Sequence, residues 1–226
     1  MISFELLTPF WVSLRLACVT TLVLLIIALP LAWWLIKTPK SFLKSIVETA
    51  VALPLVLPPT VLGFYLLIIL NEQGFLGHYW TLLTGSSLVF TFTGLVIGST
   101  LYSLPFSVQP LQTAFESIGS VPEEVAITLG ASKLDYFFSV HLFLAKRGLL
   151  TATVLAFAHT LGEFGVVLMI GGNIPGTTRV ASIAIYDLVE ELEYSNAHFL
   201  SAAMLIFSFA ILFLLFTVNK TRQVKL

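Results

Sequence analysis

One histidine and one glutamate lie four residues apart inside a long apolar stretch of the chain. They are His159 and Glu163, in the segment 158–165. Residues at this spacing share one helix face, which allows a direct pair, and ionisable groups at such positions face protein or water rather than lipid. The pair is interpreted either as a structural hydrogen bond or ion pair, or as part of a gate or transport path; a metal site would need more ligands. Gly162 and Gly165 are interpreted as allowing close helix packing.

Three prolines interrupt a second apolar stretch, at Pro54, Pro58 and Pro59. Each proline lacks a backbone N–H and frees a carbonyl that must find a partner within the protein. The sequence therefore predicts a kinked or broken helix here. The break is either a packing kink or the lining of a transport path, and the path interpretation selects Pro58, Pro59 and Thr60 as candidates.

Residues 112–147 form a polar stretch with strong local signals. Ser120-Val121-Pro122-Glu123 fits a capping box, with proline tolerated in the first turn, and predicts the start of a short helix. Gly130 can take the left-handed conformation that ends this helix. Ser132-Lys133-Leu134-Asp135 resembles a second start signal. The prediction is a helix, a glycine turn and a second helix, which serve either as a simple loop or as a docking element.

Composition places most of the chain in a bilayer. The 226 residues have a mean hydropathy of +0.99, 58% are hydrophobic and only 10% are charged, against about 25% in an ordinary soluble domain. The net charge of −1 suggests no nucleic-acid partner, and the single cysteine excludes an internal disulfide. No G-x-x-x-x-G-K-[ST] phosphate loop is present, so energy for transport would have to come from another subunit.

Five apolar runs are long enough to cross the hydrocarbon core, which takes about 20 residues of helix. The predicted spans are 10–36, 45–70, 88–110, 148–170 and 199–218. They make up one all-α membrane domain over 8–219, which contains a cytoplasmic loop at 116–145 and is followed by a basic tail at 220–226. The domain has no room for a separate globular unit.

Lysine and arginine set the orientation, because cytoplasmic loops are enriched in both. Nine of the eleven form three clusters: Lys37, Lys40 and Lys44; Lys133, Lys146 and Arg147; and Lys220, Arg222 and Lys225. Five spans place all three clusters inside and the N-terminus outside. A sixth span at 180–198 would bury four carboxylates, so this segment is predicted instead as an amphipathic helix on the outer surface. The turn at 171–179 is interpreted either as a connecting turn that docks on another protein or as a site where glycine backbone and Arg179 meet an anion.

The polar stretch resembles the EAA loop of importer-type ABC transporter permeases. The resemblance lies in Glu124-Val125-Ala126, Gly130 and Val140-His141-Leu142, with two departures at Val125 and Phe143, where the family has alanine and proline. It implies a type I importer fold, with a coupling helix seated in a groove of a separate ATPase subunit and no catalytic residues in this chain. The coupling positions that it implies are Glu124, Ala126, Gly130, Ser132, Val140 and Leu142.

Two further segments resemble the permease subunits of molybdate ABC importers. They are LPLVLPPTVL at 53–62 and LGEFGVVLMIGGNIPGTT at 161–178, and the resemblance covers nearly the whole chain. His159 departs from the arginine of the family pattern. The resemblance implies a multi-pass protein of a prokaryotic plasma membrane that carries molybdate, or possibly tungstate in its place. It also implies a homodimer with two ATPase subunits, which bind ATP and Mg²⁺, and an extracytoplasmic molybdate-binding protein.

Other functions remain open beside this one. Sulfate and thiosulfate importers have similar permeases with a related GE[FY]G segment. A self-sufficient membrane enzyme or an ion-driven carrier would use His159 and Glu163 as its reactive or proton-carrying site. A structural membrane scaffold fits the hydropathy but gives no reason for the cytoplasmic hairpin.

Overall fold

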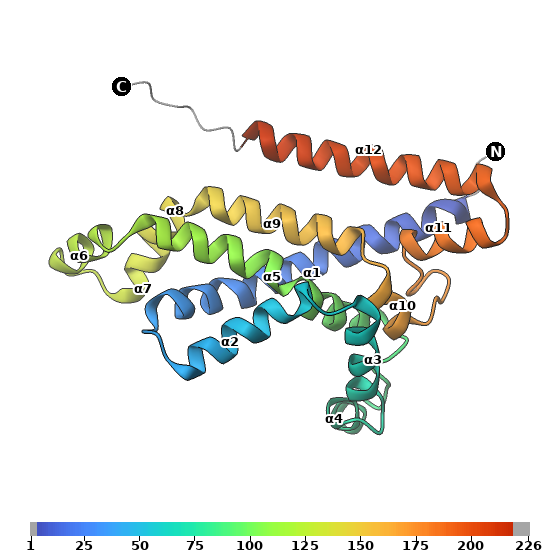
Figure 1. Cartoon of the computed structure of the whole chain (residues 1–226), viewed down its shortest axis with the longest axis horizontal. Helices are drawn as coiled ribbons and strands as arrows, with labels where there is room; N and C mark the ends of the chain where they lie inside the picture. Colours follow the sequence, from blue (N-terminus) through green and yellow to red (C-terminus); the bar gives the residue numbers. More distant parts are fainter. Residues whose placement is uncertain (1–3, 219–226) are drawn as a thin grey trace.

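The computed structural model describes the backbone of residues 4–218, which contains helices and no strand over that range. Four long helices lie along the long axis of the molecule (Figure 1): α1 (Phe4–Lys37), α5 (Phe92–Ile118), α9 (Lys146–Leu161) and α12 (Tyr194–Val218). Short helices α6 (Val121–Thr128), α7 (Lys133–Tyr136) and α8 (Leu142–Leu144) lie at one end of this bundle and α11 (Ala181–Glu190) at the other (Figure 1), while α2 (Phe42–Ala52) runs beside the long helices and α3 (Pro59–Leu70) and α4 (Phe75–Thr84) project to one side.

Helices α1, α5 and α9 pack against one another, and small residues allow the three helices to approach closely. Ala28 and Ala32 of α1 and Ala152 of α9 are fully buried in one cluster with Val108 and Leu111 of α5. Alanines at such contacts bring backbones together, which is the usual way for helices to associate where lipid offers no hydrophobic driving force. Among the described residues this is the largest buried apolar cluster, and it extends to Phe137 and Ala145 in the segment predicted as a hairpin.

The predicted break in the second span is confirmed. Helix α2 (Phe42–Ala52) runs into a 3₁₀ turn, η1 (Leu53–Leu55), and α3 (Pro59–Leu70) then starts in a direction bent by 115°. Pro58 lies between them outside the helical region, with φ −55° and ψ 137°, because the ring of the following Pro59 disfavours a helical conformation for the residue before it. The three prolines thus separate one apolar run into two helices.

The fourth predicted span, 148–170, is also broken, which the sequence analysis did not predict. Helix α9 ends at Leu161, and α10 (Gly165–Gly171) begins four residues later. Gly162 follows the last turn of α9, and Phe164 has an extended φ of −126° with ψ −60°. The whole run, although it contains His159 and Glu163, is long and apolar enough to be taken as one span, and no proline marks the break.

Two shorter helices complete the fold, of which one was predicted from the sequence and one was not. Helix α11 (Ala181–Glu190) matches the amphipathic helix expected at 180–198, and its buried Ile183 packs in a cluster with Val12 and Leu16 of α1. Helix α4 (Phe75–Thr84) was not predicted and contacts α3. Gly77 of α4 approaches the end of α3 so closely that a Cβ would lie 2.2 Å from the Leu70 carbonyl oxygen.

The span count stays a prediction. Among the described residues, α1 and α12 are each long and apolar enough to cross a bilayer, and up to four spans result if each of two bent helix pairs counts as one. Helix α5 has the length for a span, with 27 residues, but buries many small polar side chains. The basic tail predicted at 220–226 lies outside the described residues.

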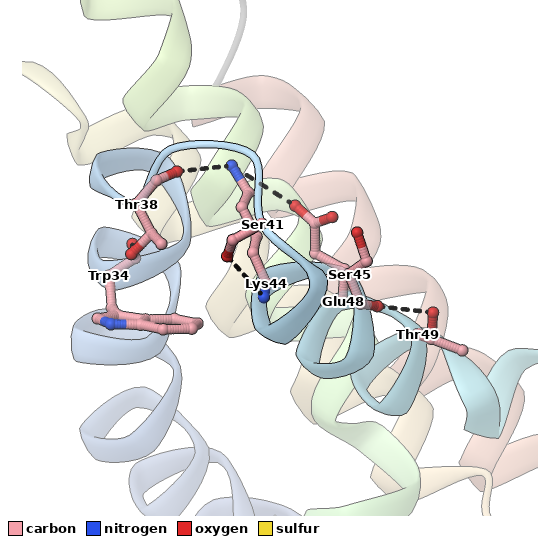
Figure 2. A network of polar contacts seen from close by, with 7 residues as sticks. All are labelled: Trp34, Thr38, Ser41, Lys44, Ser45, Glu48 and Thr49. Atoms are coloured by element: carbon pink, nitrogen blue, oxygen red, sulfur yellow. Dashed lines mark hydrogen bonds and ion pairs between the residues drawn. The ribbon is translucent and has the colours of Figure 1, made fainter.

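A polar network fixes the turn between α1 and α2, where the first basic cluster lies (Figure 2). Ser41 caps α2 by accepting a hydrogen bond from the Lys44 amide at 3.3 Å. The Lys44 ammonium donates to the Thr38 carbonyl oxygen at 3.2 Å and lies 3.8 Å from the Glu48 carboxylate. The side chain of Lys44 therefore joins both ends of the turn and sets the angle at which α2 leaves α1.

Candidate functional site: a cavity at two broken helices and a distant hairpin

The two helix breaks meet at a cavity of about 540 Å³. It is lined by Pro59, Thr60, Tyr102, Ala158, His159, Gly162, Glu163, Phe164 and Gly165. The start of α3 forms one wall, and the junction of α9 with α10 forms another. Four of the five path candidates from the sequence, Pro59, Thr60, His159 and Glu163, thus lie around one space, while Pro58 precedes α3 and is not among the lining residues.

His159 is held by α5 rather than by its sequence neighbour. Its Nδ1 lies 2.9 Å from the Ser103 hydroxyl oxygen, which is also 3.0 Å from the Thr160 hydroxyl oxygen. The ring stacks on Phe106 at a centroid distance of 3.9 Å and tilts against Tyr102 at 4.9 Å. The imidazole is therefore fixed in the cavity wall by one hydrogen bond and two aromatic contacts.

Glu163 is buried, its carboxyl has no hydrogen-bond partner among the described residues, and the direct pair with His159 is not formed. The residue is only 4% exposed, and neither carboxyl oxygen makes a hydrogen bond. Ser99 of α5 lies beside the carboxyl without a hydrogen bond of good geometry. The pair expected from the spacing was wrong because α9 ends at Leu161, so the helical geometry that brings residues four apart together does not reach Glu163.

The glycines of this region have different roles. A Cβ on Gly165 would lie 2.7 Å from the Pro59 Cβ, and one on Gly63 of α3 would lie 2.8 Å from the Met169 Cβ of α10. These contacts confirm close packing for Gly165. The same interpretation is wrong for Gly162, because a Cβ there would meet nothing nearer than 3.8 Å. Gly162 instead ends α9.

The residues of α5 that serve the site were missed by the sequence analysis. Ser99, Ser103 and Ser107 are all fully buried and recur every four residues, so they share one helix face. Tyr102 and Phe106 lie on the neighbouring face and contact His159. This serine spacing was the available signal, because small polar residues on one stripe of an apolar helix indicate the face that meets other helices.

The predicted hairpin is present at the opposite end of the bundle. Helix α6 (Val121–Thr128) is followed by Gly130, which has φ +87°, and then by α7 (Lys133–Tyr136). The capping box at Ser132 is confirmed, since its side chain accepts from the Asp135 amide and the Asp135 side chain accepts from the Ser132 amide. A π-helix, η2 (Phe137–His141), and α8 (Leu142–Leu144) complete the hairpin before α9.

The capping box predicted at Ser120 was wrong. Ser120 has helical backbone angles, φ −89° and ψ −23°, and its side chain makes no cap hydrogen bond. The Glu123 side chain, which would have completed the box, forms an ion pair with Lys37 at the end of α1 instead. The first turn of α6 thus keeps its local proline, while its Glu123 side chain pairs with a distant helix instead of capping the turn.

The six coupling positions divide between the surface and the interior of the hairpin. Glu124, Gly130 and Ser132 are exposed, Ala126 is buried, and Val140 and Leu142 are half-buried. Helix α6 also exposes apolar side chains, at Val121, Val125, Ile127 and Leu129. An apolar face on a projecting helix indicates a contact surface for another protein.

A comparison with protein families decides the assignment. The model of the family described as "binding-protein-dependent transport system inner membrane component" matches residues 25–221. The chain belongs to this family. The match includes both broken helices, the cavity and the hairpin, so the family assignment rests on nearly the whole described fold.

Individual relatives agree with the family. The chain is 55% identical to the molybdenum transport system permease protein ModB of Azotobacter vinelandii over 91% of this chain and 90% of that protein. It is 32% identical to a probable sulfate transport system permease protein of Chlorella vulgaris, over 85% of this chain and 71% of that one. In fold it matches a bacterial ABC transporter involved in the import of alginate, with a TM-score of 0.78 and 16% identity, over 99% of this chain and 81% of that chain.

Membership of this family places the chain in a transporter of several subunits. The chain is the permease subunit of an ABC transporter, which works with an ATPase and a binding protein.

In the turn at 171–179, Arg179 donates to the Asn173 side-chain oxygen at 2.7 Å and lies 3.7 Å from the Asp187 carboxylate. Because this arginine already pairs with an acid, the structure favours the interpretation of the turn as a connection rather than an anion site.

Ser103→Ala is expected to destabilise this permease, whereas Ser107→Ala is not. Loss of the Ser103 hydroxyl leaves His159 and Thr160 without their shared partner, at a cost of about 1–3 kcal/mol. Ser107 is equally buried on the same face but has no hydrogen-bond partner. The unfolding temperature measured in detergent should fall by about 2–4 °C per kcal/mol of lost stability for Ser103→Ala. It should stay unchanged for Ser107→Ala. Equal unfolding temperatures for the two variants would contradict the anchoring of His159.

Proposed function

We propose that this chain is the permease subunit of an ATP-driven molybdate importer, and that it also passes tungstate, an anion of nearly the same size and charge. One observation carries the proposal: a cavity at the junction of two broken helices lies at the other end of the bundle from a hairpin with an exposed apolar helix. Broken helices line binding sites in many transporters. The 55% identity with a molybdenum transport permease supports the choice of cargo.

The proposed assembly has two copies of this chain, two ATPase subunits on the hairpin side and an extracytoplasmic molybdate-binding protein. It lies in the plasma membrane of a prokaryote, which the chain crosses several times. ATP and Mg²⁺ bind to the ATPase subunits. Helix α6 and the turn at Gly130 sit in a groove of the ATPase, with Glu124 and Ser132 at the contact and Ala126, Val140 and Leu142 holding the hairpin in shape.

In the proposed path, the cavity is the place where access alternates. Pro59 and Thr60 start α3, and His159 and Glu163 lie at the end of α9, so a change in the angle between α3 and α10 would open or close the space. Rigid-body movement of helices around a fixed site is a common form of switching. ATP binding by the partner would drive this movement through the hairpin.

A sulfate-type importer is the second candidate function, because permeases of that class also resemble the chain at 32% identity. An ion-driven carrier has less support. It would need His159 and Glu163 to exchange a proton, and no hydrogen bond joins the two side chains.

The function is tested by uptake into liposomes that contain the full complex of permease, ATPase and binding protein. We expect labelled molybdate to enter only when ATP is present on the ATPase side, and a large molar excess of sulfate not to compete. Uptake by the permease alone along a proton gradient would establish a carrier instead. Full competition by sulfate would establish a sulfate importer.

A further inference from the structure

The cytoplasmic end of α1 contacts the hairpin through two side chains on one face. Trp33 and Lys37 are four residues apart, and the Lys37 ammonium lies 4.7 Å from the centre of the Trp33 ring. The same ammonium forms an ion pair with Glu123 in the first turn of α6. Lys37 thus links α1 to the helix that is proposed to meet the ATPase, and the indole beneath it limits where the ammonium can go.

The second half of the hairpin surrounds the same indole. The His141 ring lies 4.4 Å from the Trp33 ring and the Phe137 ring lies 4.9 Å from it. His141 Nδ1 is 3.0 Å from the Tyr136 hydroxyl oxygen, and these two residues are 2% and 1% exposed. A side chain of α1 is therefore enclosed by rings from α7 and η2, a geometry that neither helix could make alone.

Electrostatics favour a neutral imidazole in this cluster. Burial lowers the pKa of His141 to about 4, and the nearby Lys37 ammonium contributes in the same direction. The ring is therefore uncharged at neutral pH and packs as an aromatic group that also shares a hydrogen bond with Tyr136. We call Trp33, Lys37, Glu123, Tyr136 and His141 the α1 clamp.

The backbone on either side of α6 passes through a glycine in open space, whereas the α1 clamp is made of packed side chains. Gly119 joins α6 to α5 with φ +72°, Gly130 follows α6 with φ +87°, and a Cβ on either would meet nothing within 4 Å. Between the hairpin and α9 the chain bends by 75°. Glycine turns in open space transmit force poorly, because their backbone angles change at little cost.

We propose that the α1 clamp transmits displacement of α6 to α1, so that Trp33 and Lys37 are positioning residues for coupling between ATP hydrolysis and transport. The proposal rests on the proposed function of the hairpin as the ATPase contact. It adds a route from α6 into the membrane domain through side chains of α1, beside the covalent connection to α5, whose Phe115 packs against Trp33 and His141 in the same cluster. Helix α1 in turn packs along α5, α9 and α11, so its displacement would reach both ends of the bundle.

A charge exchange in the full complex tests the α1 clamp. Lys37→Glu and Glu123→Lys each replace an attraction by a repulsion, and each is expected to lower the molybdate taken up per ATP hydrolysed by about five- to tenfold, in the lower range of coupling between sites. The double variant restores an opposite-charge pair and is expected to return this ratio to within about twofold of the wild type. Lys40→Glu, with the same change of charge in the same basic cluster, is expected to leave the ratio unchanged.

One further variant and a set of contrary outcomes make the result decisive. Should a single exchange prevent assembly, Lys37→Gln removes the ion pair without repulsion, and the same drop in the ratio is expected. A normal ratio of uptake to hydrolysis in both single variants, or a ratio that stays low in the double variant, would overturn the proposal that the α1 clamp transmits displacement. Absence of ATP-dependent uptake in the wild-type complex would overturn the proposed function instead, so the two failures are distinguishable.

Discussion

Replacement of Gly130 by valine is expected to lower molybdate uptake by about tenfold or more in the full complex. Gly130 has φ +87°, a conformation that costs about 1–2 kcal/mol for a residue with a side chain and more for a β-branched one. The turn between α6 and α7 would relax to another shape and would reorient α6 on the ATPase. The measurements are uptake, ATP hydrolysis and retention of the ATPase during purification. We expect uptake to be uncoupled from hydrolysis, or the ATPase to be lost.

Gly85 provides the matched control for this change. It has a similar positive φ of +71°, also lies in open space, and ends α4 away from the hairpin. Gly85→Val carries the same backbone strain but should leave uptake and ATPase retention near the wild-type level. A complex with Gly130→Val that hydrolyses ATP and imports molybdate normally would contradict the coupling role of the hairpin.

Gly165→Ala is expected to reduce uptake by about tenfold, although it adds only one methyl group. The new Cβ would lie 2.7 Å from the Pro59 Cβ at the wall of the cavity, so α3 and α10 would have to move apart. Inserting atoms into a packed contact costs about 1–3 kcal/mol. Because this contact borders the cavity, the shift changes the proposed path as well as the stability. Uptake rates and unfolding temperature measure the two effects.

Gly162→Ala is the control, three residues away and in the same cavity wall. Its Cβ would meet nothing nearer than 3.8 Å, and its φ of −90° is accessible to alanine. We expect wild-type uptake for this variant. If the two alanine variants behave alike, close contact between α3 and α10 is not a requirement for transport.

The elements that local chemistry determines were predicted from the sequence. The proline break between α2 and α3, the hairpin with its turn at Gly130, and the amphipathic α11 all follow from residues within a few positions of one another. The capping box at Ser132 was predicted for the same reason. The family resemblance came from equally local strings of residues and was confirmed over residues 25–221.

The errors arose where a distant partner decides the outcome. Glu123 pairs with Lys37 rather than capping α6 with Ser120, and no local signal predicts a contact across 86 positions. His159 bonds to Ser103, which is 56 positions away. The break after Leu161 has no proline, so an apolar run with glycines was taken as one span. The cavity was not predictable as a volume, because it forms only where α3, α5, α9 and α10 meet.

The cavity wall has a consequence for how long a cargo would stay. None of the nine lining residues within the described chain is a lysine or an arginine, and the buried acid among them offers an anion no attraction. Conduction needs binding that is weak enough to allow release. An oxyanion in this space would therefore have a short residence time and a fast off-rate. Discrimination between anions would then fall to the binding protein that delivers them, and the permease would set the rate of passage.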